Sequence, residues 1–213
     1  MGNEKKVIIE VCVDNLDQAK KAEKLGADRI ELCSRLDLDG LTPERELILN
    51  AMNTLNIPIK VMLRPRHGNF VYNEDEIINM EKEIDFCKKI GVNAIVLGVL
   101  NLRNEVDIDL TRRLARRSMN MEVTFHKAID NTNNIIKGLS HLCKIKNIDS
   151  VLTSGGGRSI MDNGELVKTI LKKFSQKLNI ILAGSITKNN FELVHKEFSA
   201  YEYHGKAILG KLY

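Results

Sequence analysis

The chain has 213 residues, a length that suits one sizeable hydrophobic core or a single α/β barrel. Its formal net charge of +4 is spread along the sequence without a basic tail, and only 5% of its residues are aromatic, which argues against a nucleic-acid-binding protein. No apolar run approaches the roughly 20 residues of a membrane span. The polar start MGNEKK lacks the apolar core of a signal peptide, and residues 1–6 are expected to be disordered.

The four cysteines are scattered without the C-x-x-C spacing of a structural zinc site or a redox motif. They are Cys12, Cys33, Cys87 and Cys143. This usage predicts reduced thiols in a cytoplasmic protein and argues against a disulfide framework.

Strands and helices are predicted to alternate from one end of the chain to the other. The eight expected strands span residues 7–13, 29–33, 59–63, 94–99, 121–125, 151–154, 180–183 and 201–204. Amphipathic helices are expected at residues 16–25, 107–117, 134–143, 160–174 and 191–197, after Thr42-Pro43, and from Asn73 to about residue 90. Such alternation without a composition break predicts a single domain over residues 1–213, a (β/α)8 or TIM barrel.

Two features refine this fold prediction. An open doubly wound sheet is the alternative, but no G-x-G-x-x-G follows the first strand. Only nine residues follow His204, so the last helix is expected to be truncated or missing. The outer faces of the first and last strands, including Val7 and Ile9, would then be under-covered. They are expected to be buried by a homodimer or by the tail 207–213.

Several strands carry charge on one side, although parallel strands covered on both faces are usually apolar throughout. The apolar side includes Ile30, Leu32 and Val123, and it should face the helices. The other side should face the barrel lumen; it carries Glu10, Cys12, Glu31, Cys33, Lys60, Arg64, Glu122, His126, Glu202 and His204. Residues at the carboxyl ends of the strands should form the active face. Lys60 and Glu122 should lie deeper, as a structural ion pair.

Five sequence blocks resemble the signature of the CutC family, which is named for copper homeostasis. These blocks are RIELCSRLDLDGLTP, VMLRPRHGNFVY, LGVL, VTFHKAID and VLTSGGG. The resemblance implies a TIM barrel and a cytoplasmic copper-handling role. One departure is Lys127, which stands where the family usually shows arginine, and the chain also ends sooner than family members do.

The copper function implied by the resemblance points to Cys12 and Cys33 as metal ligands at the barrel mouth. Soft thiolates select Cu(I), and two cysteines on neighbouring strands would provide a site of low coordination number. The alternative for these cysteines is a small apolar filler in the core. No organic cofactor is predicted.

The charged lumen favours a second function, an enzyme acting on a small phosphorylated or carboxylated substrate by acid–base chemistry. Its candidate catalytic residues are Glu10, Glu31, His126 and Asp130, with His126 as the general acid or base. Its candidate anion-binding residues are Arg64, Arg66, Lys127, Ser154, Gly155, Gly184 and His204. The alternative is a salt-bridge network that fills the barrel.

Overall fold

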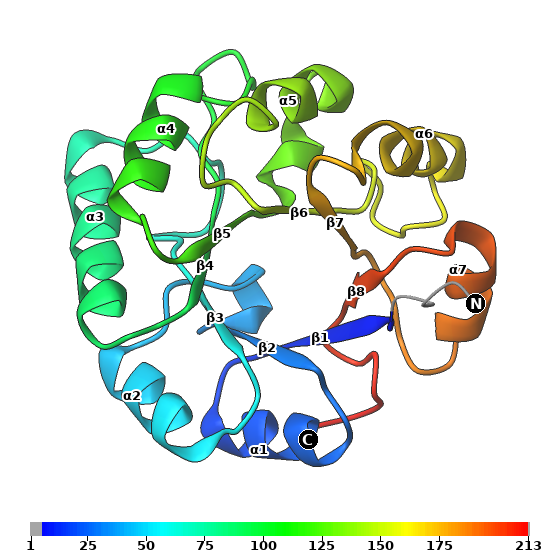
Figure 1. The fold of residues 1–213 in the computed structure, drawn as a ribbon, viewed down its shortest axis with the longest axis horizontal. Helices are drawn as coiled ribbons and strands as arrows, with labels where there is room; N and C mark the ends of the chain where they lie inside the picture. Colours follow the sequence, from blue (N-terminus) through cyan, green and yellow to red (C-terminus); the bar gives the residue numbers. More distant parts are fainter. Residues whose placement is uncertain (1–5, 213) are drawn as a thin grey trace.

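The computed structural model describes residues 6–212, and eight parallel strands close into a barrel in which each strand pairs with its sequence neighbours (Figure 1). The strands are β1 (Ile8–Val13), β2 (Arg29–Leu32), β3 (Ile59–Met62), β4 (Ala94–Leu97), β5 (Glu122–Phe125), β6 (Ser150–Thr153), β7 (Asn179–Leu182) and β8 (Glu202–His204). β1 pairs with β2 on one side and with β8 on the other, which closes the barrel. The predicted TIM barrel is therefore confirmed. The expected disorder of the N-terminus falls on residues that, except for Lys6, lie outside the described part of the chain.

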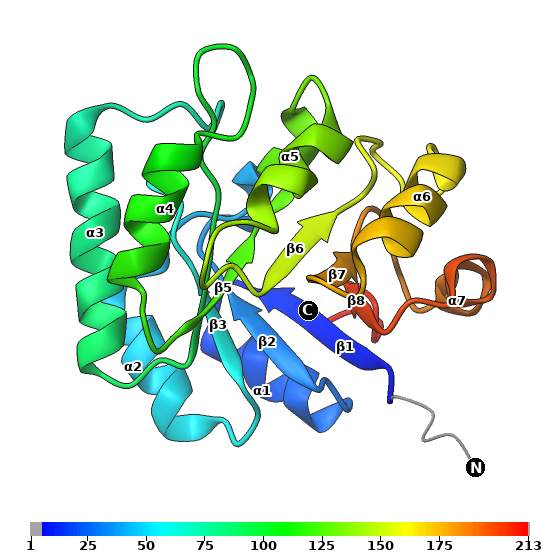
Figure 2. The same cartoon turned by 45° about the horizontal axis from the view of Figure 1, so that its top comes forward.

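Seven α-helices of the described chain surround the barrel (Figure 1; Figure 2). They are α1 (Leu16–Lys24), α2 (Arg45–Thr54), α3 (Glu74–Lys89), α4 (Ile108–Arg117), α5 (Ile135–Leu142), α6 (Gly164–Phe174) and α7 (Phe191–Phe198), with short 3-10 helices η1 (Leu36–Leu38) and η2 (Lys127–Asn131). No helix between residues 6 and 212 combines the length and the apolar character needed to cross a membrane.

Side-chain caps fix where several helices begin. Asn15, Asp107 and Asn134 each accept a hydrogen bond from a backbone N–H in the first turn of α1, α4 and α5. At α3 the expected capping box is present, because Asn73 and Glu76 each bond the other's backbone N–H.

Helix α6 begins four residues later than the sequence predicted. The Asp162 carboxylate accepts a hydrogen bond from the Ser159 N–H, and the Ile160 N–H donates to the Gly184 carbonyl. These bonds hold a turn that ties the loop after β6 to the loop after β7, so helical hydrogen bonding starts only at Gly164.

The two sides of the strands separate as predicted. Ile30, Leu32 and Val123 are fully buried in the main core cluster, with side chains from the surrounding helices. The lumen is polar on β1, β2, β3, β5 and β8, whereas it is apolar where Leu152 and Ile181 pack together from β6 and β7. This asymmetry concentrates the ionisable groups on one side of the barrel.

An eighth helix is absent from the described chain, as expected, and the tail takes its place. In Figure 1 the tail leaves β8 and runs through the sector of the outer ring between α7 and α1. Its Ile208 and Leu212 are buried in the main core cluster, and Lys188 N–H donates to the Ala207 carbonyl. Val7 and Ile9 are left partly buried.

Candidate functional site

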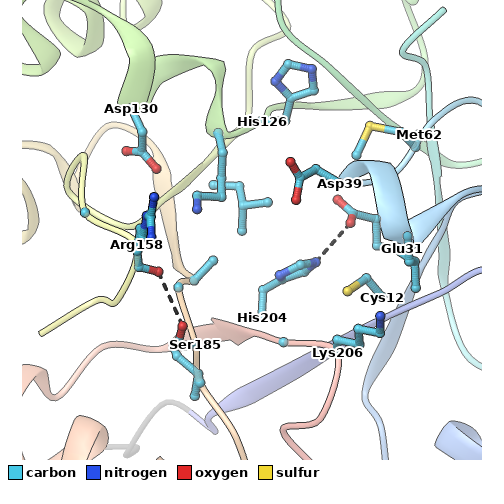
Figure 3. Close-up of a pocket in the computed structure, with 18 of the residues that line it drawn as sticks. Cys12, Glu31, Asp39, Met62, His126, Asp130, Arg158, Ser185, His204 and Lys206 are labelled. Atoms are coloured by element: carbon cyan, nitrogen blue, oxygen red, sulfur yellow. Dashed lines mark hydrogen bonds and ion pairs between the residues drawn. The ribbon is translucent and has the colours of Figure 1, made fainter. Parts of the chain in front are cut away.

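A cavity of about 790 Å³ opens at the carboxyl ends of the strands (Figure 3). Its walls come from β1, β2, β3, β6 and β8 and from the loops that follow β2, β3 and β5–β8. This is the end of a TIM barrel where functional residues gather. The cavity-lining ionisable side chains are Cys12, Glu31, Asp39, Arg64, His126, Lys127, Asp130, Arg158, His204 and Lys206.

Cys12, Glu31 and His204 form a compact buried group on one side of this cavity (Figure 3). Their candidate ligand atoms all lie within 4.8 Å of one another. Strand register explains the grouping, because Cys12 lies beside Glu31 in the β1–β2 pair. His204 Nε2 lies 2.9 Å from Glu31 Oε2, while Glu31 Oε1 is buried without a hydrogen-bond partner in the described chain.

Cys33 also contacts Glu31 but is not one of these three clustered residues. Its Sγ donates to Glu31 Oε2 at 3.6 Å, and its side chain packs with Met62 and Val96. The register places Glu31, not Cys33, beside Cys12, a consequence of the stagger between strands in a barrel.

Electrostatic surroundings set the protonation of this group. Burial would lower the pKa of His204, but its interactions with Glu31 and Cys12 outweigh burial and raise the pKa well above its usual value. Burial raises the pKa of Cys33 well above the usual thiol value, and Glu31 and Cys12 add to the shift. His204 is therefore a protonated partner of Glu31 at neutral pH.

A second charged layer lies beneath the cavity. Glu10 is fully buried, with Lys60 Nζ 3.3 Å from its carboxylate and the Arg29 guanidinium bonded to the same oxygen. Burial alone would raise the pKa of Glu10, but Lys60, Arg29 and His204 hold it at about 2. Glu10 is thus a permanently charged structural carboxylate, outside the set of described residues that line the cavity.

The predicted Lys60–Glu122 ion pair is wrong. Lys60 pairs with Glu10 and donates to the Thr124 hydroxyl at 2.7 Å, whereas Glu122, the first residue of β5, is exposed. The strand register aligns Lys60 with Ala94 and Ala94 with Glu122. The Lys60 side chain extends past this level to Thr124, two residues further along β5, so it does not meet Glu122.

Arg64 is buried and lines the cavity, but most of its guanidinium is already used. One terminal nitrogen donates to the carbonyls of Leu38, Asp39 and Gly40, and the other donates to the Gly68 carbonyl. These bonds tie the loop after β2 to the loop after β3. The Arg64 Nε remains buried without a partner among the described residues.

Arg66 lies outside the cavity-lining set. It forms a 2.6 Å ion pair with Glu76, donates to the Val71 carbonyl and lies over the Tyr72 ring. These contacts organise its own loop, and the anion-binding role expected for Arg66 stays a prediction.

His126 follows β5 and is almost fully buried at the cavity wall. Its Nδ1 accepts a hydrogen bond from Ala128 N–H at 3.1 Å, while Nε2 has no partner in the described chain. Burial, reinforced by the Arg64 charge, lowers the pKa of His126 to about 3. Neither Asp130 nor Glu10, two of the other candidate catalytic residues, is hydrogen-bonded to it within residues 6–212.

Asp130 lines the cavity but is engaged with the loop after β6. Its carboxylate accepts hydrogen bonds from the Thr153 hydroxyl, from both the N–H and hydroxyl of Ser154, and from the Gly156 N–H. Ser154 and Gly155 are buried and are not among the described residues that line the cavity, whereas Gly156 does line it. This network shapes the wall and leaves Asp130 little freedom to act as a base.

Three basic side chains also line the cavity. Lys127, Arg158 and Lys206 line it, and the side chains of all three lack a hydrogen bond or ion pair to any residue between 6 and 212. Gly184 lines the cavity as well, at φ +108°; an added Cβ there would lie 2.7 Å from the Ser154 Cβ. Only glycine lets the two loops approach so closely.

The sequence reasoning identified Lys127, Gly184 and His204 but missed Arg158, Lys206 and Asp39. Arg158 and Lys206 each follow a glycine shortly after a predicted strand end, and that signal was available. Asp39 lies in the turn after η1 at φ +64°, a loop whose path over the cavity could not be read from spacing.

Comparisons with known proteins agree with the architecture. The sequence model of the CutC family matches residues 7–209. A CutC family protein of Histophilus somni is 36% identical over 187 residues, covering 87% of this chain and 76% of that protein. The human copper homeostasis protein cutC homolog is 34% identical over 200 residues, covering 94% of this chain and 73% of its own.

Structural similarity extends this result. The crystal structure of the copper homeostasis protein CutC from Streptococcus agalactiae superposes with a TM-score of 0.89 at 28% identity, covering 95% of this chain and 99% of that one. A family match over almost the whole chain and a shared closed barrel lead to one conclusion: the chain belongs to the CutC family.

Proposed function

We propose that this protein serves copper homeostasis in the cytoplasm by binding Cu(I) at the barrel mouth, with Cys12 as the central ligand. The observation that carries the proposal is the buried group of Cys12, Glu31 and His204, whose ligand atoms lie within 4.8 Å of one another. Copper as the bound metal is also supported by the names of relatives, which include the human copper homeostasis protein cutC homolog.

Two of the three donor atoms in this group suit Cu(I). A cysteine sulfur and a histidine nitrogen are ligands that suit Cu(I), and both come from rigid strands or their ends. Cys33, held next to Glu31, would supply a second thiolate if its side chain turned toward Cys12. Glu31 is a harder ligand, and Cys, His and Glu together also form zinc sites, so zinc is the metal to test in competition.

An anaerobic Cu(I) titration against a competing chelator tests the proposal. Cys12→Ser should abolish tight binding, Cys33→Ser should weaken it, and Cys143→Ser serves as the matched control, since Cys143 is the half-buried C-cap of α5 and is not among the described residues that line the cavity. Tight binding that survives Cys12→Ser with Cys33→Ser would place copper elsewhere. Zn(II) binding without Cu(I) binding would reject copper as the cargo.

A second candidate function is favoured by the size and charge of the cavity. A space of about 790 Å³ is far larger than one metal ion requires, and three basic side chains that line it, Lys127, Arg158 and Lys206, form no ion pair within residues 6–212. We infer that the cavity also accepts a small anionic molecule, the substrate of an acid–base enzyme that would use Glu31 and His204 for proton transfer.

Calorimetric titration with inorganic phosphate tests this second function. Arg158→Gln with Lys206→Gln should weaken phosphate binding and make the remaining binding less sensitive to salt. Lys168→Gln is the matched control, because Lys168 is a surface lysine of α6 already paired with Glu197. An equal loss in the control would show only nonspecific charge attraction.

A further inference from the structure

The loops after β7 and β8 present backbone atoms to the cavity. Gly184 and Gly205, which follow these two strands, both line the cavity, and a glycine has only backbone atoms to offer there. A Cβ added to Gly184 would point into the loop after β6, 2.7 Å from the Ser154 Cβ and 2.9 Å from the Ile160 nitrogen. The neighbouring loop therefore lies on the side-chain face of Gly184, and its peptide groups face the cavity.

One of these peptide groups has a defined direction. The Gly184 carbonyl accepts a hydrogen bond at 3.0 Å from Ile160 N–H, in the loop after β6. The peptide between Gly184 and Ser185 is trans, so the Ser185 N–H points the opposite way, toward the β8 side of β7. That N–H has no hydrogen-bond partner among residues 6–212. It is a free donor at the edge of the cavity, between the loops after β7 and β8.

The loop after β8 adds a second free donor. A Cβ built on Gly205 would lie 2.5 Å from the Ile186 carbonyl oxygen, so this loop touches the loop after β7. Lys188 N–H donates to the Ala207 carbonyl at 2.9 Å and ties the two loops together. Lys206 lies between these two contacts and lines the cavity, and its N–H also lacks a partner in the described chain. Packing thus fixes both loops before any ligand binds.

Arg158 adds positive charge beside the first of these donors. Its carbonyl accepts a hydrogen bond from the Ser185 hydroxyl at 3.4 Å, which places the two residues side by side (Figure 3). The Arg158 side chain lines the cavity and forms no ion pair within residues 6–212. Asp130 lies on the same side of the cavity in Figure 3, but its carboxylate already accepts four hydrogen bonds from the loop after β6. The Arg158 guanidinium is therefore available to an anion.

We propose that these three loops bind the phosphate group of a small phosphate monoester through the N–H groups of Ser185 and Lys206 and the guanidinium of Arg158. The inference rests on the second candidate function and names its substrate class. Donors from three loops suit the three terminal oxygens of a tetrahedral phosphate better than the two coplanar oxygens of a carboxylate. The loops after the seventh and eighth strands are also where TIM barrels frequently hold phosphate.

The position of this subsite decides which part of the ligand reaches the reactive groups. Figure 3 shows Arg158 and Ser185 on one side of the cavity and Cys12 and Glu31 on the other. A monoester held by its phosphate would extend its carbon chain toward Glu31 and His204, the pair proposed for proton transfer. A space of about 790 Å³ easily holds a three-carbon molecule such as glycerol 3-phosphate.

Backbone amide nuclear magnetic resonance tests the donors in the wild-type protein. Glycerol 3-phosphate should shift the amide signals of Ser185 and Lys206 saturably. Gly205 N–H is the matched control, because it already donates to the Glu10 carbonyl at 3.1 Å and should shift much less. Succinate has a similar charge without a phosphate and should bind at least about tenfold more weakly. Equal affinity for succinate, or unmoved Ser185 and Lys206 signals at saturating glycerol 3-phosphate, overturns the inference.

Variants and the choice of ligand separate this inference from the function beneath it. Arg158→Gln should weaken glycerol 3-phosphate binding about tenfold, the loss expected for a hydrogen bond between charged groups, and Arg158→Lys should retain part of it. Lys168→Gln, at a surface lysine already paired with Glu197, should bind like the wild type. Undiminished binding by Arg158→Gln overturns this phosphate site.

The outcomes for the wild-type protein distinguish the two proposals. If succinate binds and glycerol 3-phosphate does not, the phosphate subsite falls and the anion-binding cavity stands. If succinate, glycerol 3-phosphate and inorganic phosphate all fail to bind, both proposals fall.

Discussion

His204 Nε2 lies 2.9 Å from Glu31 Oε2, so a residue of the last strand is bonded to the second strand across β1. The two residues are 173 positions apart in the sequence, and both are buried. The contact crosses the seam between β8 and β1, the part of the barrel where the described chain has no eighth helix. It also places a cation and an anion beside the Cys12 thiol, so the same pair serves both the fold and the candidate site.

Removing one partner of this pair should be strongly destabilising. His204→Ala leaves Glu31 buried beside an empty space, and an uncompensated buried charge typically costs about 3–5 kcal/mol. Urea unfolding would measure the loss, with Glu31→Gln and the double variant Glu31→Gln/His204→Ala completing a cycle. The double variant should lose less than the sum of the single losses. Additive losses would show that the two groups do not interact.

Copper affinity should rise with pH. The pKa of His204 is raised above its usual value, so at neutral pH a proton occupies the nitrogen that Cu(I) would take, and binding must release it. The apparent affinity should increase by about tenfold per pH unit for each proton released. Chelator competition at several pH values would measure this slope, and a flat profile would exclude His204 as a ligand.

Protein stability should fall between pH 6.5 and about pH 3 because of His126. Its pKa drops from 6.5 in the unfolded chain to about 3 in the fold, so below pH 6.5 the unfolded state takes up a proton that the folded state refuses. At about 1.4 kcal/mol per pKa unit, up to about 5 kcal/mol of stability is lost across this window.

A variant isolates this contribution of His126 to the acid sensitivity. The stability that Glu10 contributes through its lowered pKa is also lost as the pH falls, but only below its unfolded pKa of 4.5. The comparison therefore belongs between pH 6.5 and 4.5. His126→Gln should flatten the decline in the free energy of unfolding there, and an unchanged slope would mean that His126 is protonated in the fold.

The sequence predicted the barrel because its signals are local. Alternating strands and helices, caps such as Asn73 and the two-sided strand pattern each depend on neighbouring residues, and the structure confirms them. The identity of the ion pairs depends on the stagger between strands, which spacing alone does not reveal. For that reason Lys60 was assigned to Glu122 when it pairs with Glu10, and Glu31 was not expected beside Cys12.

The sequence predicted many of the residues that line the candidate site, but not what each of them does there. The residues at strand ends, including Arg64 and His126, do surround one cavity. Loop paths then decide what each group does. Backbone carbonyls of the loops after β2 and β3 accept hydrogen bonds from the terminal nitrogens of Arg64, and Ala128 N–H donates to one nitrogen of His126. Such contacts form between loops whose conformations are set by tertiary packing.

Gly98 should tolerate no side chain. An added Cβ would meet the His126 ring at 2.4 Å and the Ala128 Cβ at 3.1 Å, and a close-packed core cannot yield that space cheaply. Gly98→Ala should destabilise the protein by about 1–3 kcal/mol and displace His126, which its resonance would report. Gly164→Ala is the matched control, because its nearest neighbour is a Phe198 ring atom at 3.8 Å. Equal tolerance of both substitutions would contradict the packing described here.

The tail should stabilise the seam between β1 and β8 through Ile208 and Leu212. Both side chains are buried in the core sector that an eighth helix would otherwise cover, and truncating a buried Ile or Leu typically costs at least about 2 kcal/mol. Ile208→Ala with Leu212→Ala should therefore lower the free energy of unfolding and accelerate amide hydrogen exchange in β1 more than in β5. Lys211→Ala, a change at an exposed residue of the same tail, should have no effect on either measurement.

The same variant tests the homodimer expected from the sequence. Val7 and Ile9 remain partly buried beside the tail, so a second copy of the chain would bind there most readily once the tail is weakened. Light scattering over a dilution series should show a dimer for the wild type and tighter association for the double variant. A wild-type monomer at every concentration would mean that the tail alone covers the seam, and slow exchange in β1 would then persist on dilution.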